Sequence, residues 1–281
     1  MIRIVILAAA IAPPLVILKY GIAKAGANWR SEAVWNAFLL GAISAFAAVA
    51  CELALDHLLA SGHWSNAVAG SAAKAVFIAA IPEESIKFFV LVVLAEKHVD
   101  VRRFQDVIAL GLAVSLGFAT LENFGYVIAA GDWRIIAALR AITSVPGHGI
   151  DGLTMGALLV SARLDGVKDA WGAKSALLVP VLLHAAYDFA LFVIGKHIAT
   201  IWFGAAWLVV IVASAIFAIT LCRRVIARAD AADRASSRDA AAIEMLRQTM
   251  ASGAIGLIAG HLLPPPSTRI EAMARADIGA D

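Results

Sequence analysis

The sequence predicts an all-α integral membrane protein, a bundle of about seven transmembrane helices with a polar site embedded in the membrane. Of its 281 residues, 62% are hydrophobic and only 16% are charged, whereas soluble domains contain about 45–50% apolar and about 25% charged residues. The mean hydropathy of the whole chain is +0.85, so it holds more apolar side chains than one soluble core encloses. Ionisable residues inside several of the apolar stretches predict the polar site.

Seven apolar stretches are long enough to cross a bilayer, which takes about 20 residues per helix. They are residues 2–19, 33–58, 66–96, 104–130, 134–162, 174–195 and 198–222. Residues 33–51 and 198–222 contain no charged residue, which makes those two spans the clearest. The other spans contain ionisable residues, and chemistry is therefore expected there.

The first stretch has a second interpretation, because Ala8-Ala9-Ala10 resembles a signal-peptide cleavage site. Cleavage would leave Lys19, Lys24 and Arg30 outside the cell, against the charge pattern of the rest of the chain. A retained first helix is therefore favoured.

Lysine and arginine residues gather in alternate connections, after the first, third, fifth and seventh stretches. Such residues concentrate in cytoplasmic loops. This pattern predicts a protein of the cell membrane with its N-terminus outside and its C-terminus in the cytoplasm. Residues 1–222 would form the transmembrane domain, and residues 223–281 a cytoplasmic tail that is helical over about 225–250. The net charge of +2 offers no basic surface for nucleic acid, so the expected partners are the lipid bilayer and a membrane protein or peptide substrate.

Four of the predicted spans carry ionisable residues near one depth. Flanking charges place His148 and His184 at the midplane and the Glu83-Glu84 pair about 5 Å from it, at about 1.5 Å per residue. One charged side chain at the bilayer centre costs about 2.5–3.5 kcal/mol. These groups must therefore be paired, hydrated or bound to something. The full set is Glu83, Glu84, Lys87, Glu122, His148, Asp151, His184 and Asp188.

Two imidazoles and several carboxylates that converge in a wet pocket could hold a divalent metal such as zinc, with a further carboxylate as general base for peptide hydrolysis. Without a metal, a glutamate could activate water directly. A proton- or cation-coupled transporter would use the same carboxylates as a relay, although the sequence has no inverted repeat. A catalytically silent membrane scaffold is a third interpretation. Helix packing explains a single pair such as Glu83 with Lys87 more easily than the whole set.

The order of the motifs resembles the PrsW family of intramembrane proteases, relatives of the CAAX prenyl endopeptidases and bacteriocin-processing enzymes. The prenyl endopeptidases carry E-E-x-x-x-R and F-x-x-x-H, which this chain does not match, so the PrsW family is favoured. The resemblance covers about residues 75–195. Its motifs are E-E-x-x-K at Glu83, Glu84 and Lys87, F-x-x-x-E-N at Phe118, Glu122 and Asn123, a segment from Arg140 through Pro146 and His148 to Gly156, and H-x-x-x-D at His184 and Asp188.

This resemblance implies an endopeptidase, classed as a metalloprotease, that makes the first cut in a membrane-anchored anti-sigma factor. Carried over, Glu83 would be the general base and Glu84 its partner in the site. One divalent metal, expected to be zinc, would be held by Glu122, His148 and His184, with Asp188 orienting His184. The residues Lys87, Asn123, Arg140 and Asp151 are expected to shape the site.

Overall fold

The computed structural model describes residues 2–25, 27–28, 30–59, 66–97, 104–164, 170–195 and 201–252. These residues form nine α-helices and one π-helix and no strand, which confirms the predicted all-α class. The elements are α1 (Ile2–Ala25), α2 (Glu32–Leu59), α3 (Ala67–Ala73), η1 (Lys74–Ala80), α4 (Ile81–Lys97), α5 (Phe104–Ala129), α6 (Trp133–Ile142), α7 (Ser144–Leu164), α8 (Ala170–Gly195) and α9 (Ile201–Ser252).

The chain divides into two compact units, Met1–Ala229 and Asp230–Asp281, and all of the predicted site residues belong to the first. Residues 225–250, predicted to be helical, lie within α9. The apolar stretch 250–263 and the three prolines that follow it fall almost entirely outside the described residues. The domain boundary expected between residues 222 and 223 stays a prediction.

Five helices of the described chain are long and apolar enough to cross a membrane, which confirms an integral membrane protein. These spans are Ile4–Lys24, Glu32–Leu58, Phe104–Ala129, Lys174–Ile194 and Trp207–Ala232. The total of seven stays a prediction, because the stretches 66–96 and 134–162 are not single α-helices. Each of these two stretches changes helix geometry close to a proline.

The fifth stretch breaks at Thr143, whose backbone dihedral angles of −123° and −75° are not helical. Pro146 lies three residues later and has no N–H to bond to the carbonyl of Ile142, with which its ring would clash. The helix therefore ends at Ile142 and restarts at Ser144, the first residue of α7. The break turns the first residues of α7 toward the site.

The third stretch is helical from residue 67 to residue 97 but contains the π-helix η1 in its middle. The N–H of Ile81 donates to the carbonyl of Val76, five residues earlier. Pro82 follows directly and cannot donate to the carbonyl of Ile78. Single π turns are frequent at functional sites, and this one immediately precedes Glu83 and Glu84.

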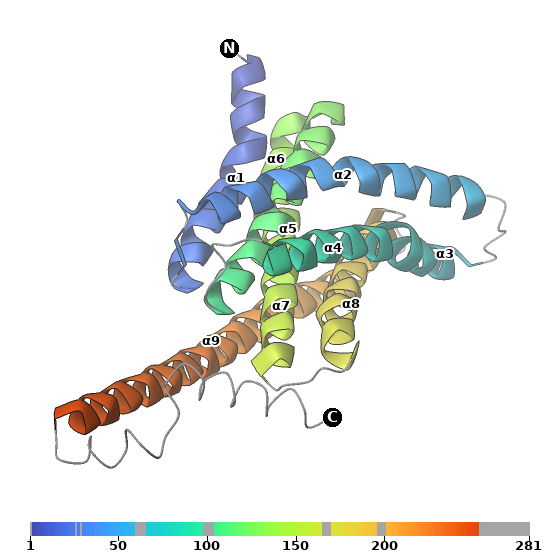
Figure 1. Ribbon diagram of the computed structural model, residues 1–281. Coiled ribbons are helices and arrows are strands. Elements are labelled where there is room, and N and C mark those ends of the chain that lie inside the picture. Colours follow the sequence, from blue (N-terminus) through green and yellow to red (C-terminus); the bar gives the residue numbers. More distant parts are fainter. Residues whose placement is uncertain are drawn as a thin grey trace. The chain divides into compact units, whose positions relative to one another are not determined.

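Helix α5 lies in the middle of the first unit and packs against α1, α2, α4, α6 and α7. Figure 1 shows α2 and α4 running alongside each other across α5. Of the apolar segment of α5, 78% is buried, against 17–33% for the other four spans. The outer helices thus present apolar side chains to lipid while α5 forms the core.

Glycines allow the backbones of α2 and α5 to touch. A Cβ atom at Gly117 would collide with the carbonyl oxygen of Phe38, and one at Gly41 with the carbonyl oxygen of Val114. Small residues at such contacts let membrane helices approach closely. This approach fixes the position of α5, which carries Phe118, Glu122 and Asn123.

Candidate active site

Four buried side chains from three helices converge in the first unit. Glu83 and Glu84 come from α4, His148 from α7 and His184 from α8, and one potential ligand atom of each lies within 4.8 Å of the others. Each residue is at most 6% exposed. The structure thus brings together four of the predicted catalytic and metal-binding residues, while Glu122 lies outside this group.

Lys87 connects the members of this group. Its ammonium donates to Oε2 of Glu83 at 3.0 Å, to Oε1 of Glu84 at 2.8 Å and to Nδ1 of His148 at 3.1 Å. It also lies 4.0 Å from the centre of the Phe118 ring, a cation–π contact. An ammonium has three N–H donors, so the three acceptors use all of them. This arrangement explains how a fully buried lysine is tolerated in the membrane.

The bond from Lys87 fixes the tautomer of His148. Because an ammonium cannot accept a hydrogen bond, Nδ1 of His148 is the acceptor and Nε2 carries the proton. This Nε2 donates to Oε2 of Glu122 at 2.7 Å. The Nδ1 side of the ring therefore faces the two glutamates of α4, and Glu122 binds the opposite ring nitrogen.

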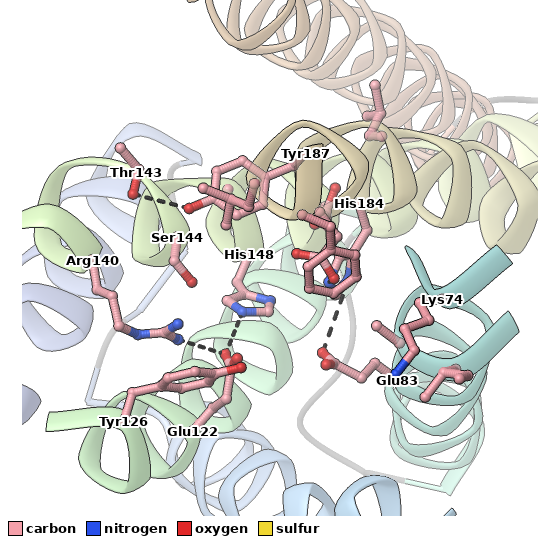
Figure 2. A pocket seen from close by; sticks show the side chains of 18 of the residues that line it. Lys74, Glu83, Glu122, Tyr126, Arg140, Thr143, Ser144, His148, His184 and Tyr187 are labelled. Atoms are coloured by element: carbon pink, nitrogen blue, oxygen red, sulfur yellow. Dashed lines mark hydrogen bonds and ion pairs between the residues drawn. The ribbon is translucent and has the colours of Figure 1, made fainter. Parts of the chain in front are cut away.

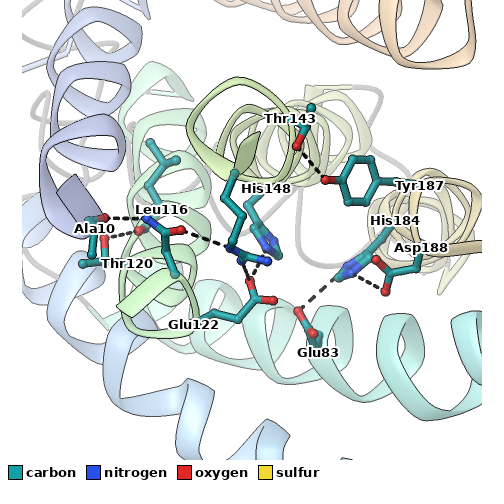
Figure 3. A network of polar contacts seen from close by, with 12 residues as sticks. Ala10, Glu83, Leu116, Thr120, Glu122, Thr143, His148, His184, Tyr187 and Asp188 are labelled. Carbon is teal, nitrogen blue, oxygen red and sulfur yellow. Dashed lines mark hydrogen bonds and ion pairs between the residues drawn. The ribbon is translucent and has the colours of Figure 1, made fainter. Parts of the chain in front are cut away.

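His184 has the same orientation toward the group. Its Nδ1 lies 2.7 Å from Oε1 of Glu84 and 3.9 Å from Oε2 of Glu83. Its Nε2 lies 3.3 Å from Oδ2 of Asp188, one turn further along α8. The two imidazole rings stand edge to face with their centres 5.4 Å apart. In both histidines, Nδ1 thus points toward Glu83 and Glu84, and Nε2 points toward a carboxylate of another residue (Figure 3).

A second charged cluster supports His148 from the side of α6. Arg140 forms an ion pair with Oε2 of Glu122 at 2.8 Å and donates from Nε to Oδ1 of Asn123 at 3.0 Å. Asn123 in turn donates to the carbonyl of Ala10 in α1 at 2.8 Å. The E-N pair of the second motif, Glu122 and Asn123, therefore ties α1, α5 and α6 together and positions Glu122 against His148.

A cavity of about 590 Å³ opens onto the site, a volume within the range of small-molecule pockets. Glu83 lines it, whereas the fully buried Glu84 does not. His148, Asp151 and His184 also line it, and Figure 2 shows the imidazole of His184 beside Glu83 and that of His148 beside Glu122. Of the two glutamates, Glu83 is therefore the one that a water molecule or substrate in the cavity can reach.

The charges of the site do not balance. Five carboxyl groups, those of Glu83, Glu84, Glu122, Asp151 and Asp188, lie together with two basic side chains, Lys87 and Arg140. Uncompensated charge in the membrane interior is costly. The surplus of negative charge must be met by bound protons or by a bound cation.

Sequence reasoning missed several cavity residues. Glu52 and Asp56 on α2 line the cavity, and Asp56 pairs with Lys74 at 2.7 Å. Tyr187 also lines it and donates to Oγ1 of Thr143 at 2.9 Å. Glu52 and Asp56 are four residues apart and share one face of an apolar helix, a signal that could have identified them.

An all-helical membrane bundle with buried acidic, basic and imidazole groups beside a cavity is the architecture of a protein that does chemistry within the bilayer. Residues 30–219 match the model of the PrsW family, described as "PrsW family intramembrane metalloprotease". The chain belongs to this family, as its motifs had indicated.

Similar proteins support the same family assignment. The chain is 35% identical to Protease PrsW of Halalkalibacterium halodurans over 68% of its own length and 86% of that protein. It is 34% identical to Protease PrsW of Bacillus subtilis over 66% of its length and 82% of the relative. No solved structure matches the chain. The relatives support a membrane protease and do not favour the transporter interpretation.

Proposed function

We propose that this protein is an intramembrane endopeptidase that hydrolyses a peptide bond of a membrane-anchored protein. The observation that supports the proposal most is the position of Glu83. It is a buried carboxylate that lines the cavity, bonds to Lys87 and faces two histidines. These groups can bind a water molecule, take its proton and hold developing charge away from lipid.

In the proposed reaction, Glu83 accepts a proton from water while the water oxygen forms a bond to the carbonyl carbon of the substrate. The π electrons of the carbonyl move onto its oxygen. When the tetrahedral intermediate collapses, these electrons re-form the carbonyl, the C–N bond breaks, and the proton held by Glu83 passes to the leaving nitrogen. Lys87 and Glu84 keep Glu83 in place during this transfer.

The donor set fits a divalent metal, and we propose zinc. Two imidazoles and two carboxylates are typical zinc ligands, and Oε2 of Glu84 is buried without a hydrogen-bond partner among the described residues. The ligands would be Nδ1 of His148, Nδ1 of His184 and a carboxylate oxygen of Glu84. Glu122 and Asp188 would orient the two rings through Nε2, as carboxylates commonly do beside metal-binding histidines. A bound zinc ion would supply Lewis-acid activation of water and of the carbonyl.

This assignment differs from the ligand set expected from the sequence, which contained Glu122. The Glu122 carboxylate contacts the far nitrogen of His148 and is already paired with Arg140. The metal-free alternative rests on the contacts of Lys87, whose ammonium bonds to three of the same groups. If Lys87 keeps them, Glu83 activates water without a metal.

The proposed substrate is a membrane-anchored protein of the anti-sigma-factor type, which the family resemblance implies. The cavity suits such a chain, since apolar residues such as Leu53, Leu191 and Val210 line it beside the charged groups. The distribution of basic residues supports an orientation with the N-terminus outside and the C-terminus in the cytoplasm.

The test compares Glu83→Gln with Glu96→Gln in proteoliposomes that contain a single-span anti-sigma factor from the same organism. Glutamine cannot accept the proton, so cleavage by Glu83→Gln should fall at least 10²-fold. Glu96 lies on the same helix but is exposed, so its variant should cut at the wild-type rate. Wild-type cleavage by Glu83→Gln would exclude the proposed role, and absence of cleavage by the wild type would overturn the proposed function together with its substrate class.

A further inference from the structure

The first turn of α7 faces the cavity with unused hydrogen-bond donors. The break at Thr143 leaves the amides of Ser144 and Val145 without a backbone acceptor one turn earlier, whereas Gly147 donates to the carbonyl of Thr143 at 2.9 Å. Thr143, Ser144 and Gly147 all line the cavity. A helix N-terminus also carries a partial positive charge, so this end of the cavity favours an electronegative atom.

The hydroxyl of Ser144 is an independent sign of a ligand. Ser144 is only 5% exposed, it lines the cavity, and its side chain has no hydrogen-bond partner among the described residues. The hydroxyl of Ser214, which lines the same cavity, instead donates to the carbonyl of Val210 at 2.8 Å. Ser115 and Thr154 also have unpaired hydroxyls, but they do not line the cavity.

Ser144 lies close to His148 and Arg140, two residues of the candidate active site. Ser144 and His148 are four residues apart on α7 and therefore share one face of the helix. Figure 2 shows the Ser144 side chain directed toward the space beside His148 and Arg140. Arg140 and Nε2 of His148 are both engaged by Glu122. Ser144 thus offers a free hydroxyl beside a guanidinium and an imidazole nitrogen that both contact Glu122.

We infer that the Ser144 hydroxyl, with the backbone amide of Ser144, binds the carbonyl oxygen of the peptide bond that is cut. This inference rests on the proposed endopeptidase function. As water adds to the carbonyl carbon and Glu83 takes the proton, the π electrons move onto this oxygen. The hydroxyl and the amide of Ser144 donate hydrogen bonds to it, and they release it when the carbonyl re-forms and the C–N bond breaks. Donors placed where charge develops accelerate acyl transfer.

The experiment uses the full chain in proteoliposomes with the same single-span anti-sigma factor as probe. Ser144→Ala should lower kcat by on the order of 10²-fold with KM nearly unchanged, since the charge on the oxygen develops only in the transition state. Ser115→Ala, which removes an unpaired hydroxyl outside the cavity, is the matched control and should retain the wild-type kcat. Ser144→Thr and Ser144→Val have the same shape and differ in the hydroxyl, so the threonine variant should be the faster of the two.

Three results would overturn the inference. The first is a wild-type kcat for Ser144→Ala in a preparation in which Glu83→Gln is inactive, an outcome that leaves the proposed function intact. The second is equal loss of activity in the threonine and valine variants with unchanged thermal unfolding, which would point to shape at this position. The third is a wild-type protein that does not cleave, which would remove the proposed function and this inference together.

Discussion

At the residue scale, the two histidines of the site are held in matching orientations. Each directs Nδ1 toward Glu83 and Glu84 and has a carboxylate at Nε2, Glu122 for one ring and Asp188 for the other. The i,i+4 spacing of His184 and Asp188 made their contact predictable from the sequence. The face of His148 that meets Glu122 was not predictable, because it depends on how α5 and α7 pack.

A metal measurement on purified protein separates the two ligand assignments. We expect about one zinc ion per chain, lost in His184→Ala, because that change removes a proposed ligand. Glu122→Ala should keep most of the metal, since a carboxylate behind a ligand typically changes affinity by about 10–100-fold without abolishing binding. His57→Ala is the control, since His57 is exposed at the end of α2. Elemental analysis in detergent gives the stoichiometry.

Loss of zinc in Glu122→Ala at saturating metal would restore Glu122 to the ligand set expected from the sequence. A preparation that cleaves its substrate without stoichiometric metal would instead show that Glu83 activates water unaided. In that case Lys87 and the histidines would act through hydrogen bonds and charge alone.

At the element scale, prolines and glycines decide how the helices serve the site. Two prolines mark helix interruptions of different kinds, since Pro146 follows a break between two helices and Pro82 follows a π-helix. Periodicity and composition do not reveal which type of helix irregularity will form. They also do not reveal that the backbones of α2 and α5 come into contact. Such features depend on tertiary contacts, which explains why the elements were predictable and their interruptions were not.

The close contact between α2 and α5 gives a prediction about stability. Gly117→Ala places a Cβ against the backbone of Phe38, which cannot move without shifting α2, so we expect a loss of about 1–3 kcal/mol. Gly125→Ala on the same helix meets no atom within 4 Å and should leave stability unchanged or slightly raised. Thermal unfolding of both variants in detergent measures the difference. Equal unfolding temperatures would mean that the two helices are less tightly packed than the structure indicates.

At the scale of the whole molecule, the site explains why residues 66–96 do not qualify as a span by length and composition. Residues 66–96 contain Lys74, Glu83, Glu84, Lys87 and Glu96, so this stretch is too charged to resemble a lipid-exposed helix. In the folded protein the central charges face one another and α8, α7 and α5 rather than lipid. The sequence identified most of the helical stretches and most of the residues that converge at the candidate site, while the pairing that makes the charges tolerable arises only from the fold.

The number of spans can be tested at residues 66–96, which the sequence predicts to cross the membrane and which are not among the five candidate spans. Residues 67–97 are helical throughout, and at about 1.5 Å per residue they extend roughly 45 Å, enough to cross a hydrocarbon core of about 30 Å. We therefore expect residues 61 and 98 to lie on opposite sides of the membrane. In a chain carrying Cys51→Ala and Cys222→Ala, a membrane-impermeant thiol reagent should label Ser61→Cys in intact cells and His98→Cys only after permeabilisation. If both positions were labelled from the same side, this stretch would not span the membrane, and the active site would lie in a re-entrant segment open to one face.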